Sequence, residues 1–278
     1  MSQNLKPSPG LRGRVYAATS AVWRLAIAAF FSLRQGAWLG LMDNRHLNGL
    51  STHFYTGRKQ WRDDAHNASG LFPWEERVVR EYFPPAGTLL VGASGGGREA
   101  AALAKRGYQV DAFDCVPALV DYSRAWLKQQ GGEVRIFSAG PGQIPEGLGR
   151  YAGVIVGWGG YMHIPGHSNR IAFLKALRAC VDSGAPILLS FFARHGPSRR
   201  LDLIHRIARI LRAIRFSRDQ VEYGDMLDGT FDHWFTRDEV AGEMAAAGFE
   251  LALYEEAPYG HAVGRAAPEG PGGMAGQE

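Results

Sequence analysis

Short apolar stretches alternate with longer amphipathic stretches through the middle of the chain. The apolar stretches predict buried strands at residues 88–91, 109–114, 133–137, 153–157 and 186–192. The amphipathic stretches predict helices at residues 98–106, 117–129 and 168–181. Strands that alternate with helices are joined by right-handed crossovers, so we expect a mostly parallel sheet.

The pattern changes after the fifth strand. A basic amphipathic helix is predicted at 198–215, a strand near 230–235, a helix at 237–247, a strand at 249–254 and a further edge segment at 259–265. Thr236 and Glu239 form a capping box before the second of these helices. The fold class we expect is a doubly wound, Rossmann-like α/β fold with a seven-stranded, mostly parallel sheet and an antiparallel C-terminal strand.

Residues 1–85 read as an N-terminal helical extension or cap. It begins with an apolar helical stretch to Met42, continues through a polar, loop-rich region to Gly70, and ends in a helix at 71–83. The core then covers 86–265, with the basic helix of 198–215 as a lid over the substrate opening. The Gly- and Pro-rich tail, 266–278, is predicted to be disordered.

The net charge of +4 is unevenly distributed. Residues 1–42 hold five cations and no acid, and residues 194–218 hold eight arginines against Asp202, so the rest of the chain is acidic. The basic helix has two interpretations: a lid with a solvated arginine face, or an element that contacts an anionic membrane surface together with the N-terminal stretch. No nucleic-acid partner is expected, because the chain shows no stacking platform or known module.

Two cysteines exclude a disulfide framework and fit a reducing cytosol. Arg24 and Arg34 divide the apolar N-terminal stretch into runs of at most nine residues, so we do not expect it to cross a bilayer. Residues 25–33 have the length of a signal-peptide core, but no small-x-small cleavage site follows closely. We therefore expect a cytoplasmic protein with no metal site, and peripheral membrane contact only under the second interpretation of the basic helix.

The most informative motif is a glycine-rich loop between the first strand and its helix. It comprises Gly92, Ala93, Ser94, Gly95, Gly96 and Gly97. Such a loop lets a ligand approach backbone N–H groups at a helix N-terminus. Asp114 ends the second strand, where its carboxylate can accept hydrogen bonds from both ribose hydroxyls of a nucleoside cofactor. The alternative is a structural βα turn followed by an ordinary aspartate.

Two cofactors fit these features. Gly95, Gly97 and Ala100 match the dinucleotide spacing G-x-G-x-x-A, which alone is a weak signal. From about 71 to 265 the chain also resembles the class I S-adenosylmethionine-dependent methyltransferases. The matching segments are the glycine loop, the strand end at 114–117, the segment 161–164, and the closing motif of Phe235, Thr236, Glu239, Ala247, Gly248 and Phe249.

This resemblance implies S-adenosylmethionine as cofactor. The residues implied to bind it are Gly92, Ala93, Ser94, Gly95, Gly97, Asp114, Cys115, Gly140, Gly157 and Trp158. The chain departs from the family at three positions. Val91 stands where the first motif has its leading acid, and Ala93 stands where it has its first glycine. The adenine-binding acid of the family falls near Gly140. Other groups must therefore hold the methionine ammonium and the adenine.

Methyl transfer needs a base only where the acceptor must lose a proton. We expect His163, which follows the fourth strand, to be that base, with His233 as a second candidate; each histidine also fits a packing role. Tyr55 and Tyr161 are predicted substrate contacts. The expected function is O- or N-methylation of a small, apolar or lipid-like molecule. The alternatives are an NAD(P)-binding oxidoreductase and a non-catalytic adenosylmethionine-binding or membrane-surface protein.

Overall fold

A central sheet carries the fold in the computed structural model, which describes residues 10–131 and 133–268. Five parallel strands lie in the order β3-β2-β1-β4-β5. Their bounds are β1 Thr88–Gly92, β2 Gln109–Asp114, β3 Val134–Ser138, β4 Gly153–Val156 and β5 Pro186–Ala193. The predicted parallel sheet is confirmed, and the carboxyl ends of its strands share one edge.

The last two strands extend this sheet beyond β5. β9 (Gly260–Ala266) pairs antiparallel with β5 and with β8 (Phe249–Glu255). The segment expected at the sheet edge is therefore an internal strand, and β8 takes the edge position. The predicted antiparallel C-terminal strand is confirmed, because β9 is the only strand of this seven-stranded array that runs against β5 among the residues described.

A hairpin outside the seven-stranded pattern is joined to the carboxyl end of β5. β6 (Asp225–Leu227) and β7 (Phe231–Phe235) pair antiparallel, and β7 meets β5 only at Phe192 and Ala193. The strand expected near 230–235 exists, but it belongs to this hairpin. β6 is too short to show a period-two pattern in the sequence.

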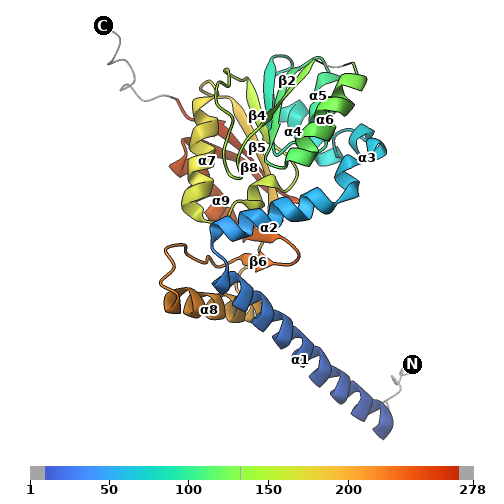
Figure 1. Cartoon of the computed structure of the whole chain (residues 1–278), viewed down its shortest axis with the longest axis vertical. Helices are drawn as coiled ribbons and strands as arrows, with labels where there is room; N and C mark the ends of the chain where they lie inside the picture. Colours follow the sequence, from blue (N-terminus) through green and yellow to red (C-terminus); the bar gives the residue numbers. More distant parts are fainter. Residues whose placement is uncertain (1–9, 132, 269–278) are drawn as a thin grey trace, which may run out of the picture.

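Helices cover both faces of the sheet (Figure 1). On one face lie α4 (Pro73–Tyr82), α5 (Arg98–Ala104) and α6 (Pro117–Gln129); on the other lie α7 (His167–Ala179) and α9 (Arg237–Ala246). Alternation along β1 divides its side chains between these layers, with Leu89 and Val91 packed toward the first face and Leu90 toward the second. A doubly wound architecture follows from this two-sided burial.

The N-terminal region is more helical than its polar composition indicates. α1 (Leu11–Leu41) is followed by α2 (Asn44–Gly57), the 3-10 helix η1 (Lys59–Arg62) and α3 (Asp64–Ala68). The expectation of a loop-rich region from 43 to 70 is therefore wrong. Asp43 and Asp63 start α2 and α3 by accepting N–H groups in their first turns. Of the predicted tail, 269–278 lies outside the described residues, and Ala266 belongs to β9.

The basic helix α8 (Arg199–Ile214) lies against α1 at one end of the molecule (Figure 1). Leu39 of α1 packs in one buried cluster with Ile204 and Ala208 of α8 and with Phe231 of β7. Arg212 donates from Nε to the carbonyl of Leu39 and from Nη2 to that of Met42, so it caps the C-terminal end of α1. The two basic segments of the sequence thus meet in space.

Candidate functional site

A cavity of about 390 Å³ opens at the carboxyl edge of β1, β2 and β4. Glycine-loop residues and Asp114 line one part of it, and side chains from α2 and η1 line another. α2 lies over the cavity as its roof and contributes Asn48, Ser51, Thr52 and Tyr55 to the lining. No α8 residue is part of this lining, so the expected lid position of the basic helix is wrong and α2 holds that place.

The glycine loop turns sharply before α5. Gly95 and Gly97 have φ values of +53° and +102°, in the left-handed region that glycine adopts without strain. A Cβ on Gly96 would lie 2.1 Å from the carbonyl oxygen of Trp61, so glycine there lets η1 close over the loop. Ala93 also has a positive φ, +51°, at the position where the resembled family has its first glycine.

A second glycine-rich segment, residues 157–160 after β4, packs against this loop. Gly157 donates its N–H to the carbonyl of Gly92 at 2.7 Å, and a Cβ on Gly157 would lie 2.5 Å from the carbonyl oxygen of Ala93. A Cβ on Gly160 would lie 2.4 Å from the Cβ atom of Ala93. The glycines after β4 therefore let the two strand-end loops approach closely and form one wall.

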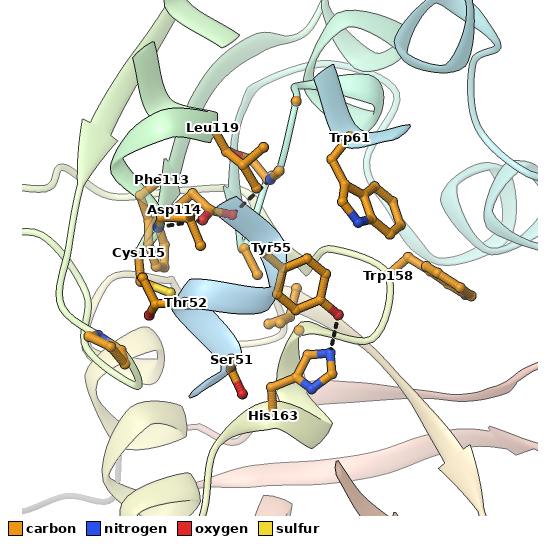
Figure 2. A pocket seen from close by; sticks show the side chains of 18 of the residues that line it. Ser51, Thr52, Tyr55, Trp61, Phe113, Asp114, Cys115, Leu119, Trp158 and His163 are labelled. Carbon is orange, nitrogen blue, oxygen red and sulfur yellow. Dashed lines mark hydrogen bonds between the residues drawn. The ribbon is translucent and has the colours of Figure 1, made fainter. Parts of the chain in front are cut away.

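Asp114 is buried at the end of β2 and faces the glycine loop (Figure 2). One carboxylate oxygen accepts the N–H of Gly95 and the other that of Val116, both at 2.8 Å. Burial raises the pKa of Asp114, although these backbone donors act against the shift. Each oxygen keeps a lone pair for a further donor, which suits a ribose diol.

A nucleoside cofactor fits the residues around Asp114. Ser94 is buried, and its hydroxyl has no hydrogen-bond partner among the described residues although it lines the cavity. Space is open beside Gly95, where a Cβ would meet nothing within 4 Å. Cys115 and Gly140 line the cavity too. Burial raises the pKa of the Cys115 thiol to about 12, so it is a neutral contact there.

A buried charge network borders the same cavity. Arg98 binds Glu75 with two hydrogen bonds of 2.7 and 2.8 Å and donates to Glu99 at 2.7 Å. Glu99 also accepts the backbone N–H of Trp158 at 3.3 Å. One guanidinium thus faces two carboxylates, and burial raises the pKa of Glu75. With both acids ionised the network has an uncompensated negative charge beside the glycine loop.

The roof brings Tyr55 onto His163 (Figure 2). The Tyr55 hydroxyl lies 2.6 Å from His163 Nε2, and His163 Nδ1 lies 2.7 Å from the carbonyl oxygen of Phe231. A carbonyl only accepts, so Nδ1 carries the proton and Nε2 accepts from Tyr55 in the neutral ring. Asp232 Oδ1 lies 3.0 Å from Nδ1. Burial, followed by the negative charge of Asp232, raises the pKa of Tyr55, which keeps it protonated.

Most sequence-predicted site residues meet at this cavity. Ala93, Ser94, Gly95, Asp114, Cys115, Gly140, Trp158, Tyr55 and His163 line it. Gly92, Gly97 and Gly157 support the wall without lining it. Tyr161 and His233 lie elsewhere: Tyr161 is buried on Phe235, and His233 is buried with Nδ1 2.7 Å from Asp225. The structure therefore places neither of these two in contact with a ligand in this cavity.

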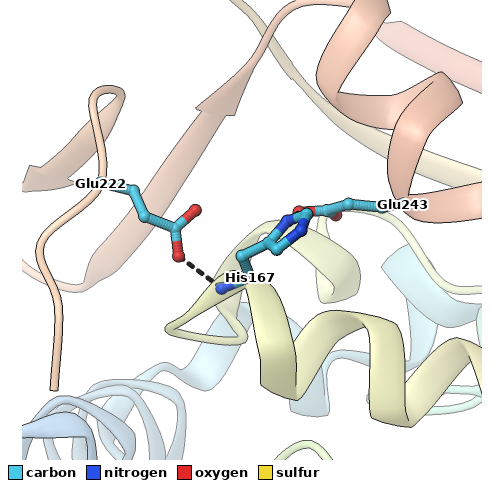
Figure 3. A group of neighbouring side chains, drawn as sticks. All are labelled: His167, Glu222 and Glu243. Atoms are coloured by element: carbon cyan, nitrogen blue, oxygen red, sulfur yellow. Dashed lines mark hydrogen bonds and ion pairs between the residues drawn. The ribbon is translucent and has the colours of Figure 1, made fainter. Parts of the chain in front are cut away.

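A second side-chain cluster contains His167, Glu222 and Glu243, whose potential metal-ligand atoms lie within 4.8 Å of one another (Figure 3). His167 Nδ1 lies 2.7 Å from Glu243. Arg170 Nη2 reaches both glutamates at 2.6 Å, and Tyr161 donates to Glu243. The guanidinium already occupies the place of a cation between the two carboxylates. The cluster is thus an ion-pair network around the buried side chains of Arg170 and Glu243, and it joins α7 to α9.

Sequence reasoning missed several residues of this site. Glu99 and Arg98 read as an ordinary first helical turn, and Ser51 and Thr52 lie in a segment that showed no helical pattern. Asp232 was visible as part of a strand, but its position beside His163 depends on the β6–β7 hairpin. Acidic residues directly after a glycine loop were the one available signal for Glu99.

Comparison with solved structures identifies the architecture. A SAM-dependent methyltransferase from Methanosarcina mazei aligns with 72% of this chain and 100% of its own, at a TM-score of 0.55 and 17% identity. The 1,6-didemethyltoxoflavin-N1-methyltransferase of Burkholderia thailandensis, solved with 1,6-didemethyltoxoflavin and S-adenosylhomocysteine, covers 81% of this chain and 91% of its own, at 0.56 and 18%. The CcbJ methyltransferase of Streptomyces caelestis covers 72% and 92%, at 0.51 and 15%.

No family model matches the sequence, and no curated protein matches it either. At these identities the structural likeness establishes the fold: the chain has the Rossmann-like fold of the class I SAM-dependent methyltransferases, as its sequence predicts.

Proposed function

We propose that the chain is a methyltransferase that uses S-adenosylmethionine to methylate an oxygen or nitrogen of a small, apolar or lipid-like acceptor. The observation that carries this proposal is one cavity with two chemically different parts. Asp114 and the glycine loop offer a nucleoside site, and Tyr55 with His163 offers a proton-accepting pair. The fold shared with SAM-dependent methyltransferases supports the assignment of the first part.

The cavity residues divide the cofactor among them. Asp114 would accept the ribose hydroxyls, and the unpartnered hydroxyl of Ser94 would gain a partner. Glu99 would attract the methionine ammonium. It would take the place of the acidic residue that the resembled family has where this chain has Val91. S-Adenosylmethionine supplies an electrophilic methyl group on a sulfonium. The protein's part in such a displacement is mainly to orient the acceptor and exclude water.

Tyr55 and His163 would act together on the acceptor proton. An acceptor O–H or N–H can donate to the Tyr55 oxygen while the Tyr55 proton passes to His163 Nε2. The raised pKa of Tyr55 opposes a free tyrosinate, so the two transfers must be coupled. The carbonyl of Phe231 fixes the ring, and the Asp232 carboxylate stabilises the imidazolium that forms.

The lining of the cavity favours a neutral, apolar acceptor. Aromatic rings surround the second part: Tyr55, Trp61, Phe72, Trp158 and Tyr259. Among the described residues, Arg98 is the only arginine or lysine in the lining, and Glu75 and Glu99 already pair with it. An anionic acceptor would find no free cation there. The same feature disfavours NAD(P), whose diphosphate would lie beside Glu99.

Calorimetry separates this proposal from its alternatives. We expect S-adenosylmethionine and S-adenosylhomocysteine to bind the purified protein, and NAD(P) to leave no heat signal. Binding of NAD(P) alone would instead favour an oxidoreductase. A screen of apolar alcohols, phenols and amines with the labelled cofactor then tests transfer. Cofactor binding without transfer to any acceptor class would favour the non-catalytic alternative.

A further inference from the structure

Exposed hydrophobic side chains gather on one part of this molecule. Of the sixteen large exposed hydrophobic side chains in the described chain, twelve lie on α1 and three at the C-terminal end of α8. Those on α1 are Leu11, Val15, Tyr16, Val22, Trp23, Leu25, Ile27, Phe30, Phe31, Leu33, Trp38 and Leu41; the three at α8 are Ile210, Ile214 and Phe216. The proposed methyltransferase site uses none of these fifteen; the sixteenth, Tyr259, lines its cavity.

The N-terminal part of α1 projects away from the rest of the protein (Figure 1). Residues 11–31 include no buried side chain, whereas the buried ones begin at Ser32 and continue through Gln35, Gly36, Leu39 and Gly40. At 1.5 Å per residue, the projecting part is about 30 Å long, close to the hydrocarbon thickness of a bilayer. The most apolar 18-residue stretch of α1 has a mean hydropathy of 1.3, and only 6% of it is buried.

The apolar residues occupy every side of the projecting part. Successive residues turn by about 100° around a helix, so the neighbouring large side chains Val22, Trp23 and Leu25 point in different directions. A paired helix or a second copy of the chain would cover one stripe and leave the others in water. A hydrocarbon medium covers all sides at once.

Positive charges predominate around this surface, where Asp202 is the one acid of α8. Residues 1–42 contain no acid, and Arg12, Arg24 and Arg34 extend from α1. On α8, Arg206 and Arg209 are exposed. The rest of the chain is acidic, so an anionic partner would be attracted to the α1 and α8 end and repelled elsewhere.

The junction of the two helices makes this surface a fixed part of the protein. Gly36 and Gly40 face α8 so closely that a Cβ on them would lie 2.8 Å from the Ile204 carbonyl oxygen and 2.6 Å from Leu211 Cβ. Arg212 and Arg215 donate to carbonyls at the end of α1. The buried junction argues against α1 as a removable signal segment, because its removal would uncover this packing.

From these features we infer that residues 11–31 of α1 insert into the hydrocarbon layer of an anionic lipid bilayer while the exposed arginines of α8 bind the lipid phosphates. The sequence favoured at most peripheral contact here, because Arg24 and Arg34 interrupt the apolar stretch; the projecting helix and its buried junction now favour insertion. Arg24 divides the inserted part into an apolar run of nine residues, 15–23, and one of seven, 25–31, and its long aliphatic stem lets the guanidinium reach toward the polar layer.

Flotation of the full-length protein with lipid vesicles tests this inference. We expect it to float with vesicles of phosphatidylcholine and phosphatidylglycerol, and less with phosphatidylcholine alone. The double variant Trp23→Ser/Phe30→Ser should lower the partition coefficient at least about tenfold, because burial of each ring is worth more than a factor of ten. Both side chains are exposed, so the variant should unfold at the same temperature as the parent protein.

A charge-reversal pair tests the second contact. Arg206→Glu/Arg209→Glu should lower binding to the anionic vesicles about tenfold or more. Lys105→Glu/Lys128→Glu changes the net charge equally on exposed positions of the acidic body and should leave binding nearly unchanged. Failure to float with either vesicle, or equal floating of the Trp23→Ser/Phe30→Ser variant, overturns the inference. Lipid-independent dimers that this variant abolishes, without vesicle binding, would assign α1 to self-association instead.

Discussion

Two carboxylates that line the cavity beside the glycine loop define how this chain would hold a cofactor. Asp114 is in the position expected for ribose recognition, and Glu99 is the acid that we propose takes the place of the one missing at position 91. They should recognise different parts of the same molecule. Ligands that lack one of these parts can therefore separate the two roles.

Methylthioadenosine, which has the ribose but no amino acid group, provides that separation. Asp114→Asn should weaken the binding of S-adenosylhomocysteine and of methylthioadenosine alike, by about 10- to 100-fold. Hydrogen bonds to charged groups contribute about 1.5–3 kcal/mol. Glu99→Gln should weaken the binding of S-adenosylhomocysteine by about tenfold and leave the affinity for methylthioadenosine unchanged. Calorimetry measures both, with the exposed Asp121→Asn as control. Equal losses for both ligands in Glu99→Gln would show that Glu99 only supports the wall.

His163 is predicted to affect turnover and not cofactor affinity. His163→Gln keeps a polar side chain but accepts no proton at neutral pH, so kcat should fall by about 10²- to 10⁴-fold. Tyr55→Phe should lower kcat as well, because it removes the hydroxyl that links the acceptor to the ring. His195→Gln, at an exposed position, is the matched control. Unchanged kcat in His163→Gln would remove this residue from the mechanism.

At the scale of elements, local patterns predicted what local forces determine. The helix at residues 117–129 was predicted with its observed bounds, because Pro117 starts it, glycine follows it and one apolar stripe runs along it. The glycine loop and Asp114 were found for the same reason: a βα turn and a strand end are adjacent in sequence to the patterns that reveal them. The fold and the cofactor half of the site were thus largely predictable.

Elements that depend on distant partners were not predictable. The position of β9 between β5 and β8 depends on pairing with residues far away in sequence, so its segment read as an edge. α2 is stabilised as the cavity roof by contacts such as Tyr55 with His163 and Ser51 with Thr230, which a polar sequence does not reveal. The acceptor half of the site consists mainly of such contacts.

The close packing of α1 on α8 gives an element-scale prediction. Gly40→Ala should lower the free energy of unfolding by about 1–3 kcal/mol, because the new methyl group would overlap Leu211 and the Ala208 carbonyl. Gly49→Ala, in α2 with nothing within 4 Å, is the matched control and should raise it by about 0.5–1 kcal/mol. Urea unfolding measures both. Equal effects would mean that α1 and α8 do not pack at this distance.

At the scale of the whole molecule, the helix inferred to enter the bilayer is continuous with the cavity roof. α1 ends at Leu41, α2 begins at Asn44, and α2 supplies Tyr55 to the cavity. An apolar acceptor dissolved in the membrane would therefore enter beside the helix that carries Tyr55 of the proton-accepting pair. The acidic body would stay away from an anionic surface, which fixes the orientation of the protein.

The ion-pair network around the buried Glu243 joins the segment before β6, through Glu222, to α7 and α9. Burial alone raises the pKa of Glu243, but hydrogen bonds and attraction from Arg170 outweigh it, so the pKa lies below its ordinary value of 4.5. A carboxyl group with a lower pKa in the folded state stabilises the fold above its unfolded-state pKa, and this contribution is lost as the pH falls through the folded-state pKa.

Glu243→Gln should therefore reduce the free energy of unfolding at neutral pH, by about 3 kcal/mol, because Arg170 would remain buried with less compensation. The difference from the parent protein should persist down to about pH 4.5 and shrink below it, where the parent's own Glu243 becomes protonated. Urea unfolding across this pH range measures the difference. Glu250→Gln, on an exposed position of β8, should show no such difference. A gap between Glu243→Gln and the parent that stays constant to the lowest pH would show that packing, and not the charge of Glu243, provides the stabilisation.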